Sequence, residues 1–343
     1  MGQADSPEAP ILKYRISPRR PYSLALTAAR YARFPDAVDR FDGRTYERLL
    51  PVGRGAVLLS VRQAGGPTRA FLDVSLEGSG AESPLAREAA RRVVEGALGA
   101  GTDVRDFYRD CGADPILAAA IRDFPGMRIA GWPSLWEALV TAILSQQINL
   151  RFAYAMRHEL SSAFGRRARR GGRTHTAFPS PRDLASLTPR ALRRMRVSGA
   201  KAGTILGLAR AFASGDLSEA ELAPLSDEAA IDRLMSFRGV GRWTAEIALL
   251  RGLGRTDIFP AGDLSIVKYL AVGLLGRGSR AAEKDMRDFA RRWEPHRGLA
   301  LVYAYAELAR REGDRPLSPG SRLPPRLPRE RSRPPESARS RTG

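Results

Sequence analysis

The hydrophobic pattern of the first quarter of the chain alternates in short runs, at residues 45–50, 56–63 and 69–76, after an opening run at 13–16. Gly- and Pro-containing turns at 51–55 and 65–68 separate these runs, a pattern that predicts an antiparallel sheet. Apolar residues at helical spacing predict helices at 24–33 and 84–98, the second of which would cover one face of the sheet. With one or two short helices at 103–122, residues 13–122 are predicted to form an α+β domain.

The remainder of the chain has the apolar spacing of helices, and residues 123–312 are predicted to be mainly α-helical. Helices are expected at 181–186, 188–194, 198–213, 264–275, 279–292 and 298–310. An apolar stripe from Trp136 to Leu144 indicates a buried helix, which is predicted to continue past Ser145-Gln146-Gln147. Because a polar triplet inside an apolar helix is costly to bury, we expect Gln146 and Gln147 to lie at an opening in the core.

Three segments lack apolar periodicity. Residues 1–12 are predicted to be a disordered leader, and the Pro-, Arg- and Ser-rich residues 313–343 a disordered basic tail, because neither could bury a core. Residues 165–176, GRRARRGGRTHT, carry five arginines, no acid and two adjacent glycines, which predicts a mobile basic loop. This loop is either a solvated surface insertion or a segment that follows DNA.

A tight turn, Gly239-Val240-Gly241, lies between a short apolar segment and an apolar-periodic run, which predicts a helix, a hairpin and a second helix. Glycines at both ends of the turn would let the backbone approach a bulky partner. The free N–H groups at the start of the second helix would face the same point, where a phosphate fits. Arg238 and Arg242 flank the turn and would add phosphate contacts.

Asp263 follows a loop containing Pro260 and Gly262 and precedes an apolar helix. Taken alone, an Asp in this position is most often only the N-cap of its helix. The acid and the hairpin together resemble the helix-hairpin-helix DNA glycosylase superfamily, whose signature is such a hairpin, a Gly/Pro-rich loop and an essential Asp about twenty residues later. Both roles can coexist, since a helix N-terminus favours a carboxylate by roughly 0.3 to 1 kcal/mol.

The resemblance covers residues 14–310 and is closest to the bacterial DNA-3-methyladenine glycosylase II group. It implies that Asp263 is the catalytic acid, that Trp243 lies beside the base pocket and that Tyr305 stands where the group has a stacking Trp. Ile247 replaces a Tyr of the group, so the pocket would have fewer aromatic walls. Ordinary core packing is the alternative role for Trp243 and Tyr305.

The same resemblance implies which residues contact DNA. Gln147 would fill the gap left by the extruded nucleotide, where Leu is the commoner residue of the group. The other expected DNA-binding residues are Gln146, Arg238, Gly239, Gly241, Arg242 and Thr244. The resemblance also implies a structural Na⁺ or K⁺ ion on the backbone carbonyls of Met235, Phe237 and Val240.

Composition supports a nucleic-acid partner and restricts the chemistry. The net charge of +19, with only four lysines among 56 basic residues, suits a polyanion, although coding bias would also enrich arginine. The single Cys111 excludes an internal disulfide and a four-thiolate iron–sulfur cluster, and the three histidines show no ligand spacing, so no catalytic metal or other cofactor is expected. No run of about 18 apolar residues predicts a membrane span. We expect a cytoplasmic, nucleoid-associated monomer.

The reaction implied by the resemblance is base excision without strand cleavage. Trp243 occupies the place where bifunctional members keep a Lys that forms a Schiff base, and Trp has no amine. Lys268 is expected on another face of its helix from Asp263, and Lys201 cannot be placed near the site. The expected substrate is double-stranded DNA with damaged bases, from which alkylated purines such as 3-methyladenine and 7-methylguanine would be flipped and hydrolysed off. Cationic bases suit an aromatic pocket.

Two alternatives remain open. The first is a glycosylase for deaminated bases such as hypoxanthine or uracil. Product analysis on different lesions would separate this hypothesis from a glycosylase for alkylated purines. The second is a non-catalytic helix-hairpin-helix DNA-binding protein. Such a module needs no acid at position 263, so the presence of Asp263 at the spacing of the superfamily counts against it.

Overall fold

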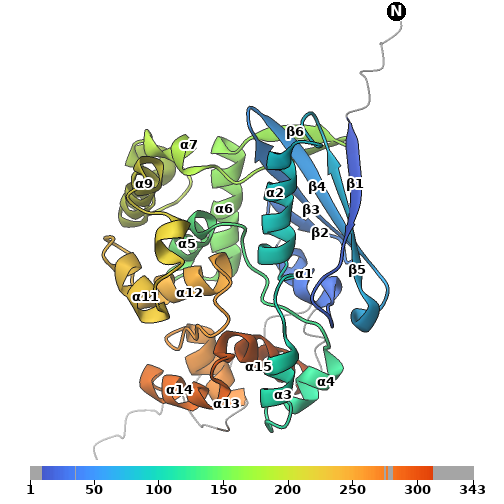
Figure 1. Cartoon of the computed structure of the whole chain (residues 1–343). Helices are drawn as coiled ribbons and strands as arrows, with labels where there is room; N and C mark the ends of the chain where they lie inside the picture. Colours follow the sequence, from blue (N-terminus) through green and yellow to red (C-terminus); the bar gives the residue numbers. More distant parts are fainter. Residues whose placement is uncertain (1–9, 35, 274–275, 277–280, 312–343) are drawn as a thin grey trace, which may run out of the picture.

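A five-stranded antiparallel sheet forms one side of the molecule and helices form the rest (Figure 1). The structure, a computed structural model, describes residues 10–34, 36–273, 276 and 281–311. The sheet has the order β1-β5-β4-β3-β2, with the strands β1 (Ile11–Ile16), β2 (Asp39–Phe41), β3 (Thr45–Val52), β4 (Gly55–Ala64) and β5 (Phe71–Glu77). The predicted antiparallel sheet is confirmed, and β2 is an additional short strand at its edge. Ile11 and Leu12, at the end of the predicted leader, belong to β1, and residues 1–9 lie outside the described part.

Two helices cover the inner face of the sheet. Alternate residues of the strands, such as Val57, Leu59 and Leu72, are fully buried against them. Each helix begins where a serine side chain accepts a backbone N–H: Ser23 from Leu26, and Ser83 from Ala86. The helices are α1 (Leu24–Arg33) and α2 (Pro84–Arg91), the latter continued by a π-helical turn η2 (Arg92–Ala97), and a 3₁₀ turn η1 (Pro67–Arg69) precedes β5.

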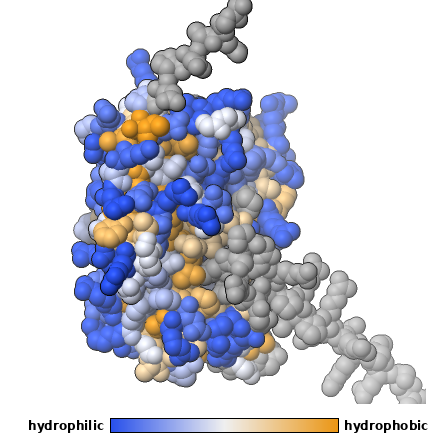
Figure 2. Space-filling model, turned by 90° about the vertical axis from the view of Figure 1, so that its right-hand side faces the viewer, coloured by the Kyte–Doolittle hydropathy of each residue, from blue (hydrophilic) through white to orange (hydrophobic). Residues whose placement is uncertain are grey.

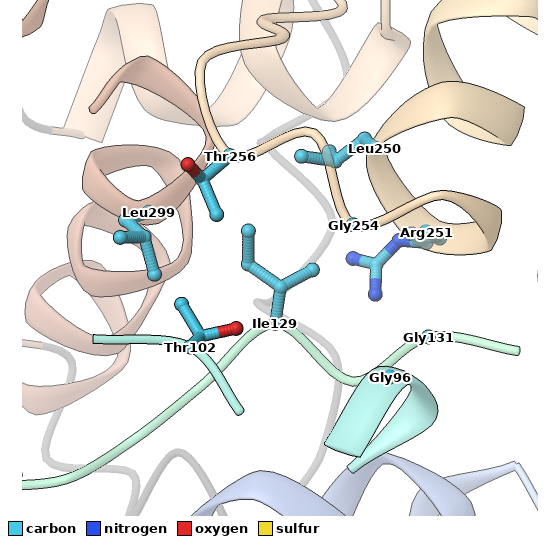
Figure 3. Close-up of a pocket in the computed structure, with 9 residues that line it drawn as sticks. All are labelled: Gly96, Thr102, Ile129, Gly131, Leu250, Arg251, Gly254, Thr256 and Leu299. Carbon is cyan, nitrogen blue, oxygen red and sulfur yellow. The ribbon is translucent and has the colours of Figure 1, made fainter. Parts of the chain in front are cut away.

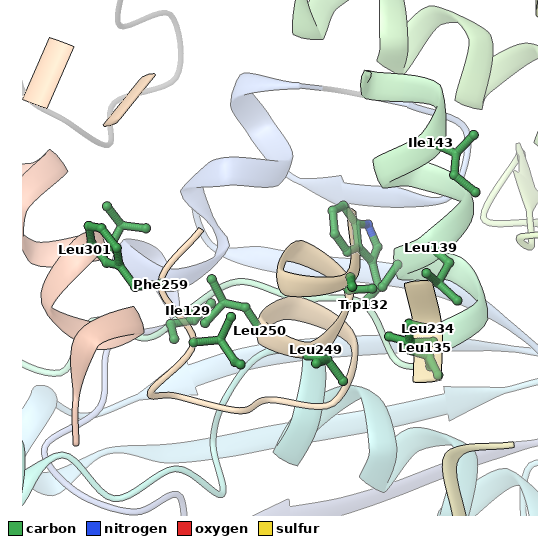
Figure 4. Close-up of a cluster of buried hydrophobic side chains, with 14 of the residues drawn as sticks. Ile129, Trp132, Leu135, Leu139, Ile143, Leu234, Leu249, Leu250, Phe259 and Leu301 are labelled. Atoms are coloured by element: carbon green, nitrogen blue, oxygen red, sulfur yellow. The ribbon is translucent and has the colours of Figure 1, made fainter. Parts of the chain in front are cut away.

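The helical region has a second hydrophobic core, built around the packing of α5 (Leu135–Ser145) on α12 (Arg242–Gly252). Figure 4 shows apolar side chains of both helices and of neighbouring loops gathered in this core. Gly252 lets the two helices approach, because a Cβ there would lie 2.7 Å from the Cβ of Ala138.

The other helices are α3 (Arg105–Cys111), α4 (Ala118–Asp123), α6 (Leu150–Phe164), α7 (Pro181–Ala185), α8 (Pro189–Arg193), α9 (Gly199–Ser214), α10 (Glu219–Leu222), α11 (Asp227–Met235), η3 (Ile266–Leu270, a π-helix), α13 (Ala271–Gly273), α14 (Glu283–Ala290), η4 (Arg291–Trp293) and α15 (Arg297–Arg311).

The predicted continuous helix through Ser145-Gln146-Gln147 is wrong. α5 ends at Ser145 and α6 begins at Leu150, after Asn149 accepts the Phe152 N–H as its N-cap. Gln147, between the two helices, has a φ of 55°. Local hydrogen bonding by Asn149 therefore outweighs the helical periodicity of the apolar residues on either side.

The expected mobile loop at 165–176 is instead a two-stranded hairpin of β6 (Arg167–Arg170) and β7 (Arg173–Thr176). Gly171 and Gly172 form its turn with φ values of 52° and 74°, which few other residues adopt. Ala168 and Ala177 pack on Leu49 and Leu58 of the sheet. The hairpin thus covers part of the sheet opposite α1 and α2.

The predicted helix 264–275 is helical over all of its described residues, 264–273, which include η3 and α13. The predicted helix 279–292 begins later, at Glu283, and corresponds to α14 and η4; residues 274–275 and 277–280 lie outside the description. The basic tail 313–343 lies outside it as well. No helix within the described ranges is long and apolar enough to cross a membrane.

The face of the molecule in Figure 2 is mostly hydrophilic, with hydrophobic residues in small groups between polar ones. Among the described residues, the exposed large hydrophobic side chains are Ile11, Leu85, Met235 and Leu264. Met235 precedes the predicted hairpin turn and Leu264 follows Asp263 directly. Two of the four therefore lie in the segment that carries the candidate chemistry.

Candidate active site

The loop between α12 and η3 holds Asp263 at the start of a helix. Its buried residues Ile258 and Phe259 anchor it in the core, and the Asp263 N–H donates to the Pro260 carbonyl at 2.8 Å. The Asp263 Oδ1 accepts the backbone N–H of Ser265 at 2.8 Å, so the residue is also an N-cap. Gly262 beside it faces the Glu283 carboxylate of α14, since a Cβ there would lie 2.8 Å from its Oε2.

Two side chains from distant elements bind the same carboxylate. The Trp243 Nε1–H, in the first turn of α12, donates to Oδ2 at 2.8 Å. The Ser265 hydroxyl donates to Oδ1. Each carboxylate oxygen thus has a fixed donor, and the acid is held between α12 and the helix that follows it.

Tyr305 of α15 extends this arrangement, since its hydroxyl lies 2.5 Å from the Ser265 Oγ. Burial raises the pKa of Tyr305 well above its ordinary value, and the negative charge of Asp263 raises this pKa further, against the opposing effect of the hydrogen bond between Tyr305 and Ser265. The phenol is therefore neutral. Ile247, one helical turn after Trp243, is half-buried against the core of the helices.

The turn at Gly239-Val240-Gly241 is closed by the Val240 N–H, which donates to the Phe237 carbonyl at 3.0 Å. Gly239 has a φ of 86°, and a Cβ on it would lie 2.0 Å from Oγ1 of Thr204 on α9. Gly241 is exposed and forms the N-cap of α12. The first N–H groups of α12 therefore lie at the exposed end of the turn, as helix geometry requires.

The two arginines beside the turn differ in their surroundings. Arg238 is exposed. Arg242 binds both oxygens of Glu228, at 2.6 and 2.7 Å, and the buried Glu246 at 3.2 Å. Its guanidinium is thus committed to carboxylates of this chain, whereas Arg238 remains the cation directed to solvent.

Gln146 connects the end of α5 to the turn. Its Nε2 donates to the Gly239 carbonyl at 3.1 Å and to the Thr244 Oγ1 at 3.0 Å. Gln147 is exposed next to it. Of the predicted DNA-binding pair, Gln146 braces the turn from within and Gln147 alone projects outward.

Sequence reasoning missed two residues of this site. Lys201 of α9, which we could not place near the site, donates from Nζ to the carbonyls of Leu144 and Gln146 at 3.0 and 2.8 Å. Ser265 is the second, through its contacts with Asp263 and Tyr305. The contacts of Lys201 had no signal beyond the helical pattern around it, because its partners are more than 50 residues away. Ser265 stands two residues after Asp263, and this short spacing was a local signal for its contact with the carboxylate.

Within the described ranges, no group of three or more His, Cys, Asp or Glu side chains is arranged to hold a metal ion. The carbonyls of Met235, Phe237 and Val240 stay a prediction as ligands of a monovalent cation. Of these three carbonyls, that of Phe237 already accepts the Val240 N–H.

Two hollows elsewhere in the molecule do not include Asp263. A cavity of about 20 Å³ beside Ile129 and Thr256 has room for about one water molecule, and Arg251 lines it (Figure 3). Burial lowers the pKa of Arg251 to about 9. A groove of about 560 Å³ lies between α2 and the start of α5, at the opposite end of α5 from Gln146. Neither hollow contains Asp263, which is half-buried.

Comparison with known proteins connects this geometry to a family. The HhH-GPD superfamily of base excision DNA repair proteins matches residues 140–295, which include the turn, Trp243 and Asp263. The DNA-3-methyladenine glycosylase of Bacillus subtilis (strain 168) is 32% identical over 206 residues, which cover 60% of this chain and 68% of that protein.

Solved structures share the fold. The 3-methyladenine DNA glycosylase from Archaeoglobus fulgidus superposes with a TM-score of 0.72 at 24% identity, over 86% of this chain and 98% of that chain. The 8-oxoguanine glycosylase/lyase of Clostridium acetobutylicum, in complex with double-stranded DNA, superposes with a TM-score of 0.66 at 17% identity, over 88% of this chain and 98% of that chain. The match of sequence across the turn and acid, together with this fold, shows that the chain belongs to the HhH-GPD superfamily of base excision DNA repair proteins.

Proposed function

We propose that the protein is a monofunctional DNA glycosylase that removes alkylated purines, of the 3-methyladenine and 7-methylguanine type, from double-stranded DNA. The observation that carries the proposal is the carboxylate of Asp263, held by Trp243 and Ser265 beside an exposed helix-hairpin-helix turn. The relative from Bacillus subtilis, named a DNA-3-methyladenine glycosylase, supports the substrate class. The chain spans about two thirds of the length of the two Bacillus subtilis relatives that it matches.

The proposed mechanism has two parts: the damaged base leaves the stack, and a carboxylate stabilises the positive charge that develops on the sugar. A base inside a duplex must leave the stack at a cost of a few kcal/mol, which backbone contacts at the turn and the exposed Gln147 would offset. Breaking the N-glycosidic bond builds positive charge on the sugar, and a fixed carboxylate below C1′ stabilises it and orients the attacking water. Alkylated purines already carry positive charge, so they leave without a protonating residue. The indole of Trp243 and the exposed Leu264 offer such a base an aromatic and an apolar surface.

Strand cleavage is not part of the proposed reaction. The place of the Schiff-base lysine is taken by Trp243, whose N–H is bound to Asp263. Lys201 points to two backbone carbonyls at the end of α5. The fold alone does not decide this point, since a glycosylase/lyase shares it. We also propose that the protein acts on DNA as a cytoplasmic, nucleoid-associated monomer, with a structural Na⁺ or K⁺ ion at the hairpin.

The direct test is release of free base from duplexes that contain 7-methylguanine, hypoxanthine or uracil. We expect release from the first duplex by the wild-type protein. Asp263→Asn should lose it by at least about 100-fold with little change in DNA affinity, because the substitution is nearly isosteric but removes the charge and one of the two oxygens that accept hydrogen bonds from Trp243 and Ser265. Release of hypoxanthine or uracil alone would support a glycosylase for deaminated bases. DNA binding without release of any base would support a non-catalytic DNA-binding protein.

A second test addresses the absence of lyase chemistry. Borohydride added during turnover should trap no protein–DNA adduct, and nicked product should appear only after alkali. The lyase reading would be correct if an adduct formed and disappeared in Lys201→Met or Lys268→Met.

A further inference from the structure

A chain of hydrogen bonds leads from α15 to the candidate catalytic carboxylate. The single hydroxyl proton of Ser265 goes to Oδ1 of Asp263, because an ionised carboxylate can only accept. The contact of 2.5 Å between Ser265 Oγ and the Tyr305 hydroxyl is then a bond that Tyr305 donates. The direction of the chain is therefore Tyr305 to Ser265 to Asp263.

The chain lies in surroundings that strengthen it. Tyr305 is neutral, since burial raises its pKa, and so it keeps the proton that it donates. Of the described residues, Asp263 and, from α12, Arg251 act electrostatically on the phenol. Glu283 of α14, which a Cβ on Gly262 would meet, binds Arg287. Hydrogen bonds that point in one direction polarise one another in a partly buried setting.

We propose that Ser265 and Tyr305 are positioning residues of the excision reaction, which fix the catalytic carboxylate of Asp263 through a one-way hydrogen-bond relay. Tyr305 then acts through its hydroxyl and not by stacking its ring on the base. The inference rests on the proposed glycosylase function and adds the device that orients its acid. Trp243 holds the other oxygen, so the carboxylate cannot rotate while the relay is intact.

The relay has two consequences that can be measured. Each donor holds the carboxylate in the position from which it acts on the sugar, so loss of a donor should lower the single-turnover excision rate while DNA affinity stays unchanged. Tyr305 reaches Asp263 only through Ser265, so the effect of its hydroxyl should vanish once Ser265 is removed. A ring that stacks on the base would show neither behaviour.

The experiment measures the single-turnover excision rate of 7-methylguanine and the affinity for the lesion duplex for Ser265→Ala, Tyr305→Phe and the double variant. We expect a loss of rate of roughly 10- to 100-fold for Ser265→Ala, the size of a hydrogen bond to a charged group, and a smaller loss for Tyr305→Phe. DNA affinity should be unchanged in both, and the rate of the double variant should equal that of Ser265→Ala. Tyr303→Phe on the same helix is the control, because its hydroxyl bonds to the Phe124 and Met127 carbonyls and its loss should leave the excision rate unchanged.

Some outcomes would overturn the relay while leaving the glycosylase function in place. An active wild-type protein with a Tyr305→Phe variant of unchanged excision rate would assign Tyr305 to stacking. Additive losses in the double variant would show that the two residues act separately. A wild-type protein that releases no base would overturn the function, and the relay with it.

Discussion

At the scale of single residues, the two glycines of the turn have different reasons to be glycine. Gly239 has a φ of 86° and no room for a side chain against Thr204, whereas Gly241 has a φ of −94° and open space around its Cα. Gly239 is glycine for conformational and steric reasons. Gly241 is glycine because a residue without a side chain leaves a surface that a partner can approach.

This difference predicts the effects of alanine on stability. Gly239→Ala should lower the free energy of unfolding by about 1 to 3 kcal/mol, because a left-handed backbone and a clash with Thr204 must both be accommodated. Gly241→Ala is the matched control, for which we expect a change below about 0.5 kcal/mol. Urea unfolding of both variants checks this, and equal losses would show that the turn is not under the constraint described.

At the scale of elements, the junction between α5 and α6 carries the residue proposed to enter the DNA. Lys201 and Gln146 brace this junction against the turn, and Gln147 sits on it with a φ of 55°. A non-glycine residue in this conformation is strained by about 1 to 3 kcal/mol. The backbone strain thus lies at the residue whose side chain projects outward and is proposed to enter the DNA.

Glycine at position 147 should therefore separate stability from activity. Gln147→Gly should raise the free energy of unfolding by up to about 1 kcal/mol, since the strain is relieved, while excision falls because no side chain fills the gap in the duplex. Gln147→Ala controls for loss of the side chain alone and should lower excision without the gain in stability. Unfolding curves and 2-aminopurine fluorescence next to the lesion measure the two effects; unchanged base flipping in both variants would exclude Gln147 as the wedge.

At the scale of the whole molecule, a buried ion cluster joins the sheet to the helices. Arg48 of β3 binds Asp39 at 2.7 Å and also Glu137 of α5. Arg157 of α6 contacts Asp36, Asp39 and Glu137. The cluster has three carboxylates and two guanidiniums, so it is neutral when it keeps one proton.

Glu137 is a carboxyl of this cluster with a raised pKa. Burial raises its pKa from 4.5 to about 7, and Asp39 adds to the rise against the opposing charge of Arg48. A carboxyl whose pKa is higher in the folded state contributes stability that is present below its unfolded pKa and is lost as the pH rises through the folded value. The cluster should therefore hold the two parts of the molecule together best in mildly acidic solution.

The prediction is a pH-dependent difference between the wild-type protein and Glu137→Gln. As the pH rises from 5 to 8, the variant should gain about 1 to 3 kcal/mol in unfolding free energy relative to the wild type, because glutamine carries no proton to lose. Glu88→Gln should not reproduce this, since the hydrogen bond from Arg91 lowers the pKa of exposed Glu88. Urea unfolding at several pH values is the measurement. If the difference in unfolding free energy between the two proteins did not change with pH, Glu137 would not be the group that titrates.

Local signals determined much of this protein from the sequence alone. Alternation and helical periodicity predicted the antiparallel sheet and most helices, because burial of one face dictates the spacing of apolar residues. The turn at Gly239-Val240-Gly241 and the acid at Asp263 were also predicted, since each depends on a few neighbouring residues. The hairpin at 165–176 had a local signal too, the pair Gly171-Gly172, which the density of arginine concealed.

Only the tertiary structure decided which distant residues meet at the site. Trp243 and Tyr305 reach Asp263 and Ser265 from 20 and 40 residues away, and Lys201 reaches the end of α5 from 55 residues or more. The ion cluster likewise unites residues separated by up to 121 positions, from Asp36 to Arg157. Periodicity states which face of a helix is buried but not which partner it is buried against, and these contacts exist only after the helices have packed.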